Sequence, residues 1–384
     1  MKKLISLTIV SILLIGCCSF TGFAADEGEL QIKAKSGVLM DVSTGQVLYS
    51  FSENEKLYPA SVTKIMPLLL FMEALDKGEI SLTDTVTTSP TAAAKGGSQI
   101  WLKEGETMSV DELLRATAIG SANDACTALG EHIAGSEFGF VKMMNDRAKE
   151  LGMVNTNFVN CSGLDDDTTE HLTTAYDIAL MSRELLKHER IKTYTTVWMD
   201  SLRNGETQLV NTNKLVRFYS GTTGLKTGTT SKAGHCLSAS AERDGLHLIA
   251  VVMGADNSTD RFEGAKAMLN WGFANFETVT PEIDSSLFTQ VKILRGVEES
   301  IRPAITGIKP LTLRAGEKNQ LQTEIELCES VEAPVEKNQT LGTVSLKIGD
   351  REIARYNLVS EKEVKKTNIG HIIVRFLSSL AKSA

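Results

Sequence analysis

Three short stretches of this 384-residue chain carry side chains that could make and break covalent bonds, and the first holds Ser61 and Lys64. If a helix begins near Ser61, the three-residue spacing places both side chains on one face, where their polar ends can meet. A serine hydroxyl is a poor nucleophile, and a lysine can act as its base if burial or a second cation lowers the lysine pKa. Taken alone, however, the pair is better explained as an ordinary helix start, with Ser61 as the N-cap and Lys64 in solvent.

The second stretch is "IGSAND", in which Ser121 and Asn123 can project from one short turn. The third is "TGLKTGTT", which offers Lys226, the hydroxyl of Thr227, and Gly228 on a strand-like segment. A glycine in a strand lets the backbone of a ligand approach closely. Alone, the second stretch would be a turn that connects helices, and the third could be an ordinary edge strand with a Gly-Thr turn.

The elements that must position these residues can be read from the hydrophobic pattern. Residues 37–50 alternate around a Ser-Thr-Gly turn and predict a β-hairpin. Apolar residues at three- and four-residue spacing predict a helical section over about 61–195. Segments 235–241 and 246–255 predict two strands, and 261–276 a helix that packs back on them. This order predicts an α+β fold in which N- and C-terminal strands share one antiparallel sheet flanked by helices.

The pattern changes after about residue 277. Segment 321–328 alternates cleanly, and 343–358 reads as a hairpin around Gly349 and Asp350, so we expect a small all-β domain. The tail predicts a basic amphipathic helix, which suits an anionic membrane surface, although it could instead dock on its own β domain. Its apolar residues lie on one helical face: Ile369, Ile372, Ile373, Phe376, Leu377 and Leu380.

The N-terminus predicts export. Lys2 and Lys3 precede an apolar run and then small residues, the pattern of a signal segment cleaved after Ala24 or Ala25. The sequence before Cys17 also resembles a lipobox, and in that alternative Cys17 would be lipidated.

Composition excludes other classes of function. A net charge of −8 with no basic block argues against a nucleic-acid partner. The cysteines form no CxxC pair and the six histidines are scattered, so we expect neither a metal nor another cofactor. Four cysteines follow the signal segment and can form disulfides in three pairings or remain buried thiols: Cys126, Cys161, Cys236 and Cys328.

Together and in this order, Ser-x-x-Lys, Ser-x-Asn and Lys-Thr-Gly are the signature of penicillin-binding proteins and active-site serine β-lactamases. The chain closely resembles the low-molecular-mass penicillin-binding proteins that are serine-type D-alanyl-D-alanine carboxypeptidases. The resemblance covers nearly the whole chain and implies a signal peptide (1–24), a transpeptidase-like α+β domain with a helical subdomain (25–276), a small β domain (277–360), and a linker with a membrane-anchor helix (361–384).

The resemblance also implies roles for residues of the first two motifs. Ser61 would attack the carbonyl between the two terminal D-alanines of a peptidoglycan stem peptide, and Lys64 would take its proton. Ser121 would relay a proton to the leaving D-alanine. Asn123 would hold Lys64 and the substrate backbone. Water would then release the acyl-enzyme, and β-lactam antibiotics would be covalent inhibitors of an enzyme on the outer face of the bacterial cytoplasmic membrane.

In the third motif, Lys226 and Thr227 would bind the substrate carboxylate, and Lys226 would keep Lys64 neutral by like-charge repulsion. Gly228 and Thr229 would line the substrate site, with the backbone N–H groups of Ser61 and Thr229 as the oxyanion hole. Arg261 could assist with the carboxylate or could equally be a helix-surface arginine.

Two departures from the β-lactamase pattern favour a carboxypeptidase. The middle motif is Ser-Ala-Asn instead of Ser-Asp-Asn, and no Glu-x-x-Leu-Asn segment occurs between residues 121 and 226. A β-lactamase or related esterase on the same fold remains the alternative, followed by a catalytically silent cell-wall binding module. Pro67 lies inside the helix expected after Ser61 and predicts a kink unless the first turns tolerate it.

Overall fold

The computed structural model describes residues 30–165, 167–370 and 373. The predicted signal segment, Cys17, and most of the predicted C-terminal helix lie outside the described residues. Over the ranges that are described, no helix is long and apolar enough to cross a bilayer.

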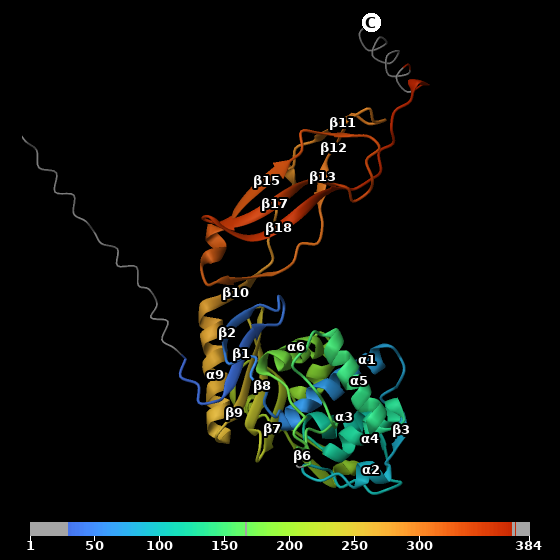
Figure 1. Cartoon of the computed structure of the whole chain (residues 1–384), viewed down its shortest axis with the longest axis vertical. Helices are drawn as coiled ribbons and strands as arrows, with labels where there is room; N and C mark the ends of the chain where they lie inside the picture. Colours follow the sequence, from blue (N-terminus) through green and yellow to red (C-terminus); the bar gives the residue numbers. More distant parts are fainter. Residues whose placement is uncertain (1–29, 166, 371–372, 374–384) are drawn as a thin grey trace, which may run out of the picture. The chain divides into compact units, whose positions relative to one another are not determined.

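A five-stranded antiparallel sheet forms the centre of the N-terminal region (Figure 1). Val38 pairs with Val251, so the first and last strands of this region are direct neighbours, as predicted. The 37–50 hairpin and the strands at 235–241 and 246–255 are also confirmed. In sheet order the strands are β2 (Val47–Phe51), β1 (Ser36–Asp41), β9 (Leu246–Ala255), β8 (Gly234–Arg243) and β7 (Thr222–Thr230).

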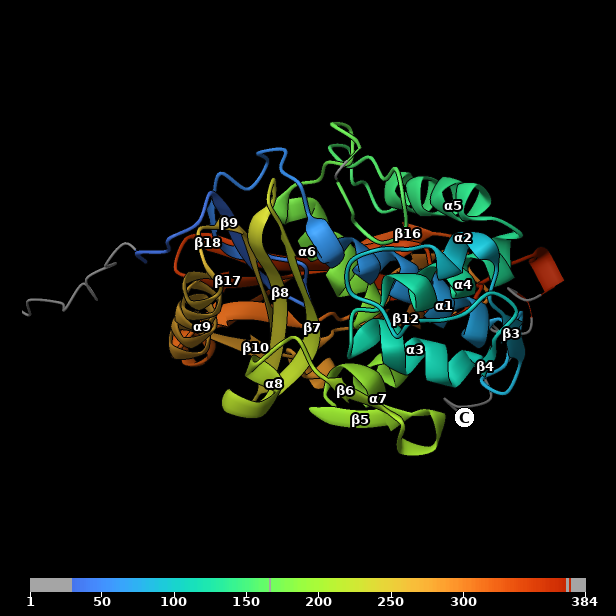
Figure 2. The same ribbon diagram turned by 90° about the horizontal axis from the view of Figure 1, so that it is seen from below.

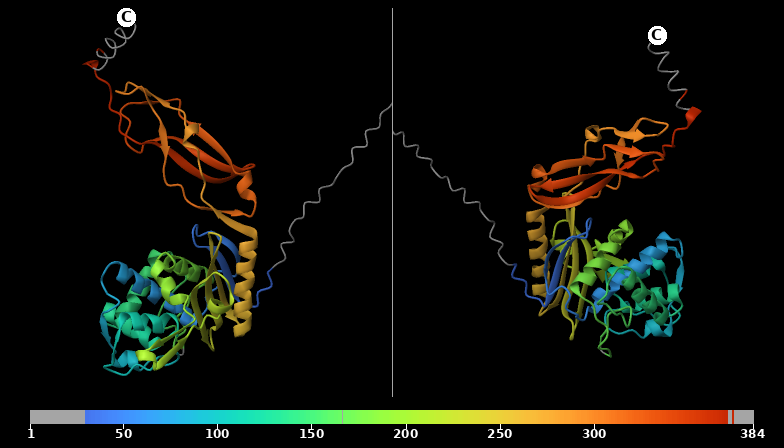
Figure 3. Two further views of the ribbon diagram at one scale, coloured as in Figure 1. Left: turned by 180° about the vertical axis from the view of Figure 1, so that it is seen from behind. Right: turned by 45° about the horizontal axis from the view of Figure 1, so that its top comes forward.

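Helices cover both faces of this sheet. Helix α9 (Ser258–Asn275) lies on one face, and the helices between β2 and β7 lie on the other (Figures 1 and 3). Figure 2 shows the same order from below, with α9, the strands and then α3 and α4. All ten residues of β9 are buried because both faces are covered. The larger helices on the second face are α1 (Ile65–Asp76), α3 (Val110–Ala118), α4 (Asn123–Ala134), α5 (Glu137–Glu150) and α6 (Ala175–Leu185).

Local sequence explains where these helices begin. Ser109 and Glu112 form a reciprocal capping box at the start of α3, and the side chains of Thr174 and Asn257 cap α6 and α9. The helix expected at Ser61 instead begins as the 3₁₀ helix η1 (Ala60–Lys64), which has no side-chain cap, so the N-cap role considered for Ser61 is wrong.

Pro67 is tolerated for a related reason. Because α1 begins at Ile65, Pro67 is its third residue. The first N–H groups of a helix have no intrahelical partner, so the missing N–H of Pro67 removes no helical hydrogen bond.

Shorter elements complete the N-terminal region. They are the 3₁₀ helices η2 (Glu189–Ile191) and η3 (Arg203–Gly205), the helices α2 (Pro90–Ala93), α7 (Lys192–Thr195) and α8 (Leu215–Phe218), and the strands β3 (Thr85–Thr87), β4 (Thr107–Ser109), β5 (Met199–Leu202) and β6 (Thr207–Val210).

Short strands dominate the chain after α9, as the change in pattern predicts. The hairpin around Gly349 and Asp350 is confirmed by the pairing of β17 with β18. Val335, Leu341 and Val364 belong to a separate small apolar core. The elements are β10 (Phe276–Val279), η4 (Ser285–Leu287), β11 (Val291–Leu294), β12 (Ser300–Ile301), β13 (Pro303–Ile305), β14 (Leu311–Arg314), η5 (Glu317–Gln320), β15 (Gln322–Leu327), β16 (Ser330–Glu332), β17 (Thr340–Ile348) and β18 (Arg351–Ser360).

Candidate active site

Ser61 and Lys64 lie in η1, the 3₁₀ turn that leads into α1 and packs against β7. The Nζ of Lys64 lies 2.9 Å from the Oγ of Ser61. Lys64 is completely buried, whereas Ser61 is partly exposed. A buried amine therefore supports a hydroxyl that a substrate can still reach, which is the arrangement needed for a serine nucleophile with a lysine base.

The surroundings of Lys64 bring the pKa of its amine closer to neutral pH. Burial lowers the pKa of Lys64 to about 8, although Cys126, Cys161 and Asp124 partly offset this effect. Burial also lowers the pKa of Lys226, and repulsion from Lys64 is the second cause. The sequence led us to expect that repulsion from Lys226 would lower the pKa of Lys64. In the structure, burial lowers the pKa of Lys64, and the repulsion between the two amines lowers the pKa of Lys226.

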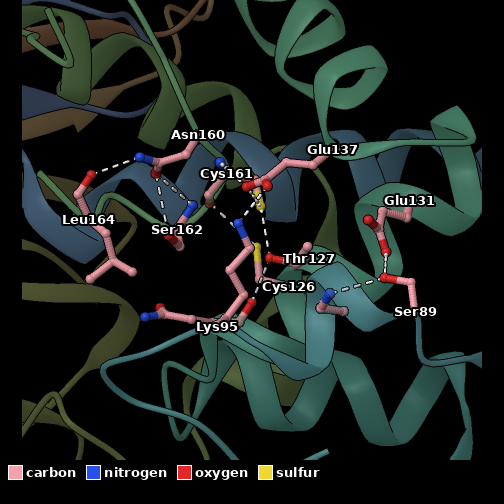
Figure 4. Close-up of polar contacts among 12 residues, drawn as sticks. Ser89, Lys95, Cys126, Thr127, Glu131, Glu137, Asn160, Cys161, Ser162 and Leu164 are labelled. Carbon is pink, nitrogen blue, oxygen red and sulfur yellow. Dashed lines mark hydrogen bonds and ion pairs between the residues drawn. The ribbon is translucent and has the colours of Figure 1, made fainter. Parts of the chain in front are cut away.

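A short loop supplies the second partner of Lys64. The Nζ of Lys64 donates a hydrogen bond of 2.7 Å to the carbonyl oxygen of Ser162. The side chain of Asn160 fixes the loop, because its Oδ1 accepts from the N–H of Gly163 at 2.7 Å and its Nδ2 donates to the carbonyl oxygen of Leu164 at 2.7 Å (Figure 4). This loop orients the amine beneath Ser61.

Gly163 allows the loop to press against η1. Its φ is +85°, and a β-carbon added there would lie 1.9 Å from the carbonyl oxygen of Ala60 and 2.8 Å from the Oγ1 of Thr63. Glycine is therefore required both by the backbone conformation and by the close approach.

The same loop is tied to the far end of β7. Asp165 is buried, and its Oδ2 accepts a hydrogen bond of 2.6 Å from the Oγ1 of Thr230. The Nζ of Lys232 donates to the carbonyl oxygen of Asp165 at 2.5 Å. Residues 160–165 thus link η1 to the strand that carries Lys226.

His171 connects the loop to the nucleophile turn and is fully buried. Its Nε2 lies 2.8 Å from the Oγ1 of Thr63, and its Nδ1 accepts from the N–H of Val159 at 3.1 Å. Since Nδ1 accepts, Nε2 carries the proton and donates to Thr63. Burial, followed by repulsion from Lys64, lowers the pKa of His171 to about 4, which keeps the ring neutral.

Ser121 and Asn123 lie at the start of α4 and are nearly completely buried. The Nδ2 of Asn123 donates to the carbonyl oxygen of Gly96 at 2.6 Å, and its buried Oδ1 has no partner among the described residues. The expected contact between Asn123 and Lys64 is therefore corrected: the hydrogen bonds of Lys64 go to Ser61 and to the carbonyl oxygen of Ser162. The side-chain Nδ2 of Asn123 instead donates to Gly96, and its backbone N–H donates to Ser98.

The third motif lies on β7, an edge strand of the sheet. The Nζ of Lys226 donates to the carbonyl oxygen of Thr227 at 2.9 Å, and the Oγ1 of Thr227 donates to Thr212 at 2.7 Å. A β-carbon at Gly228 would lie 2.7 Å from the carbonyl oxygen of Pro59 and 2.9 Å from the amide nitrogen of Ser61. The sequence suggested that a ligand backbone would approach Gly228. In the structure, the backbone that approaches it is that of Pro59 and Ser61 in the same chain.

Arg261 extends from α9 toward the end of β7 and is only 8% exposed, so the helix-surface alternative is wrong. Its Nη1 donates to the carbonyl oxygen of Gly228 at 3.1 Å and to the Oγ1 of Thr229 at 3.0 Å. Its Nε is buried with no partner in the described part of the chain. The guanidinium thus brings a positive charge beside Thr229.

Two of the cysteines lie beneath the site. The Sγ of Cys126 donates to the carbonyl oxygen of Cys161 at 3.5 Å (Figure 4). All four cysteines of the described chain carry free thiols, with Cys328 exposed and the others buried. No group of His, Cys, Asp and Glu within the described ranges is arranged to hold a metal ion.

The structure therefore packs the third motif against η1, places the second motif at and just before the start of α4, and adds residues that sequence reasoning missed. Asn160, Ser162, Gly163, Asp165 and His171 support the site from a segment between the second and third motifs. The Asn, Ser, Gly and Asp residues of this segment are a loop signal, but nothing local links that loop to Ser61.

A serine hydroxyl beside a buried amine of lowered pKa, next to an edge strand that carries a second lysine, is suited to acyl transfer through a serine ester. Comparison with known families gives the class: residues 23–257 match the model described as D-alanyl-D-alanine carboxypeptidase, Peptidase_S11, and residues 276–366 match the penicillin-binding protein 5 C-terminal domain. The chain belongs to the serine-type D-alanyl-D-alanine carboxypeptidase family. The function predicted from the three motifs is confirmed.

Individual relatives agree. The chain is 41% identical to D-alanyl-D-alanine carboxypeptidase DacF of Bacillus subtilis, an alignment that covers 100% of both chains. Penicillin-binding protein 5 from Haemophilus influenzae aligns with a TM-score of 0.79 and 31% identity over 88% of this chain and 98% of that one. Penicillin-binding protein D2 from Listeria monocytogenes, solved in an ampicillin-bound form, aligns with a TM-score of 0.59 and 32% identity over 64% of this chain and 99% of that one.

Proposed function

We propose that Ser61 is the nucleophile and Lys64 the base of this carboxypeptidase, acting on peptidoglycan stem peptides that end in D-Ala-D-Ala. The observation that carries the assignment is the 2.9 Å contact between the Oγ of Ser61 and the buried Nζ of Lys64. Ser61 Oγ attacks the carbonyl carbon between the two D-alanines while its proton moves to Lys64.

The developing oxyanion is held by the backbone N–H groups of Ser61 and Thr229. The close approach of Gly228 to the amide nitrogen of Ser61 supports this pairing, because it brings β7 against the nucleophile turn. Ser121 passes a proton to the leaving D-alanine nitrogen, and water then hydrolyses the ester on Ser61.

The substrate is held by the remaining motif residues. Lys226, Thr227 and Arg261 attract the terminal carboxylate, and the positive charge and burial of Arg261 beside Thr229 support that role. The Oδ1 of Asn123, buried without a partner among the described residues, accepts from the substrate backbone. β-Lactams use the same site and leave Ser61 acylated.

Mass spectrometry and D-alanine release test the assignment together. We expect the wild-type enzyme to release D-alanine from a diacyl-L-Lys-D-Ala-D-Ala peptide and to carry one penicillin adduct on Ser61. Ser61→Ala should lose both properties while it keeps the wild-type melting temperature. An adduct on another residue, or an adduct that persists in Ser61→Ala, would refute the nucleophile.

We further propose that residues 1–24 are a signal peptide, that 25–276 and 277–360 are the catalytic and small β domains, and that 361–384 anchor the enzyme to the outer face of the cytoplasmic membrane. The basic residues and the apolar stripe of the tail support the anchor. Deletion of 367–384 should move the enzyme to the soluble fraction. Retention on the membrane after that deletion and after Cys17→Ser would exclude both proposed anchors.

A further inference from the structure

Trp101 is exposed and has an unfavourable backbone conformation. Its side chain is 73% exposed and its φ is +59°. A residue with a β-carbon seldom occupies this left-handed region, and such strain persists only where the surrounding structure imposes it. A strained, exposed tryptophan is a candidate for ligand contact, and its supports can be identified.

Both neighbours of Trp101 are fixed. The buried carboxylate of Asp124 accepts from the N–H of Ile100 at 3.1 Å and from the N–H of Leu102 at 3.0 Å. Arg203 donates to the carbonyl oxygen of Ile100 at 2.9 Å. The backbone on each side of the indole is thus held from two elements, so the ring is presented on a rigid support.

Beside Trp101 lies a groove of about 720 Å³, a size suited to a small ligand. Its walls combine one aromatic side chain with charged groups of both signs, Lys103, Glu104, Arg203 and Glu206. The Nε of Arg203 is already paired with Glu106 at 2.8 Å, which weakens any attraction for a phosphate. An aromatic face with mixed polar neighbours favours a neutral ligand that has an apolar face and many hydroxyl or amide groups, such as a pyranose ring.

The segment just before Trp101 contacts Asn123, a residue of the second motif. The N–H of Asn123 donates to the carbonyl oxygen of Ser98 at 2.7 Å, and a β-carbon on Gly97 would lie 2.8 Å from Asn123 Nδ2 and 3.4 Å from Leu164. Residues 96–98 therefore border the site between Asn123 and the loop at Leu164, and Trp101 follows a few residues later. If the amino end of a bound stem peptide runs along this segment, the amino sugar that it bears reaches the groove.

We infer that the groove at Trp101 binds an N-acetylated amino sugar of the glycan to which the stem peptide is attached. The inference rests on the proposed function, since it assumes a stem peptide at Ser61. Trp101 would stack on the sugar ring. The enzyme would therefore prefer a pentapeptide that carries the saccharide over the free pentapeptide.

The test compares kcat/KM for D-alanine release from a disaccharide-pentapeptide and from the free pentapeptide of the same sequence. The wild-type enzyme should favour the disaccharide form by roughly fivefold to tenfold, a range consistent with one aromatic contact. Trp101→Ala should bring this ratio close to one, while Trp101→Phe should retain most of it. Phe138→Ala removes another exposed aromatic side chain, which is 85% exposed and outside the groove, and should keep the wild-type ratio.

Glu206 lies on another part of the groove wall, and Glu206→Ala should also lower the ratio of the two kcat/KM values. This variant replaces Trp101→Ala in the test if Trp101→Ala fails to fold. A wild-type ratio near one, or a ratio that is the same in the Trp101 and Glu206 variants as in the wild type, overturns the inference while release itself continues. Release from neither substrate by the wild-type enzyme contradicts the proposed function, and the inference falls with it.

Discussion

The Nε2 of His171 lies 2.8 Å from the Oγ1 of Thr63, the residue directly before Lys64 in the chain. The other ring nitrogen accepts from the N–H of Val159, which precedes the loop that holds the Lys64 amine. One neutral imidazole therefore joins the turn that carries Ser61 to the loop that contacts the Lys64 amine.

His171→Ala should lower both stability and acylation by penicillin, because it leaves the partners at Thr63 and Val159 unsatisfied. Each buried polar group left without a partner costs about 1–3 kcal/mol. Thermal unfolding and the acylation rate constant measure the two effects. Thr63→Val removes only one of the two hydrogen bonds and should fall between wild type and His171→Ala. An unchanged acylation rate in His171→Ala would show that the bridge does not position the catalytic pair.

The pH dependence of acylation should report the proton of Lys64. Its pKa is lowered to about 8, so the amine is protonated and unable to accept a proton below that pH, and neutral above it. The rate constant for penicillin acylation should therefore rise with pH through a midpoint near 8 and then level off. A flat profile over roughly pH 6 to 10 would contradict Lys64 as the base.

The same residue should make stability depend on pH. The folded-state pKa lies below the ordinary value of 10.5, so the unfolded chain binds more protons between about 8 and 10.5. The contribution of Lys64 to the free energy of unfolding therefore increases as pH rises through this window. In Lys64→Met, the slope of stability against pH in this window should be smaller than in the wild type, as measured by denaturant unfolding.

Gly163→Ala should displace the loop that holds Lys64. The new methyl group would meet the carbonyl oxygen of Ala60, and the φ of +85° is unfavourable for alanine. Gly152→Ala is a matched control, since Gly152 has a φ of +76° but nothing within 4 Å of the added carbon. We expect Gly163→Ala to be less stable than this control by about 1–3 kcal/mol and to be acylated more slowly. Equal effects of the two substitutions would show that the close approach is unimportant.

Gly228→Ala should impair chemistry more than folding. Its β-carbon would press on the amide nitrogen of Ser61 and the carbonyl oxygen of Pro59. If that amide stabilises the oxyanion, acylation should slow by up to about 10²–10³-fold, the effect of losing one such donor. The acylation rate constant and the melting temperature of Gly228→Ala are both compared with those of the wild type. If both fall together, the substitution causes a folding defect and does not act on the chemistry.

Much of this architecture follows from local sequence. The alternation over 37–50 and the Gly349-Asp350 turn predict the hairpins that the structure contains, because period-two patterns and turn residues are local signals. The residues of the three motifs were also identifiable from type and spacing. The sequence alone does not decide the position of Arg261, since only the packing of α9 on the sheet determines which face of that helix is buried.

The supporting residues could not be predicted in the same way. The contact between Lys64 and the carbonyl oxygen of Ser162 joins positions 98 residues apart, and no periodicity encodes such a pairing. The position of Pro67 in the first turn of α1 was also unpredictable, because it depends on η1 ending at Lys64.

The atom that holds the Lys64 amine opposite Ser61 belongs to the main chain of Ser162. Every amino acid carries that carbonyl, so a point mutation at position 162 cannot delete the interaction. A substitution that displaces this carbonyl would have to act elsewhere in the loop, at Asn160 or Gly163, and would disturb the packing of the loop against η1. If Lys64 is the base proposed above, the contact that orients it is insensitive to the side chain at position 162 and sensitive to Asn160 and Gly163, which shape the loop.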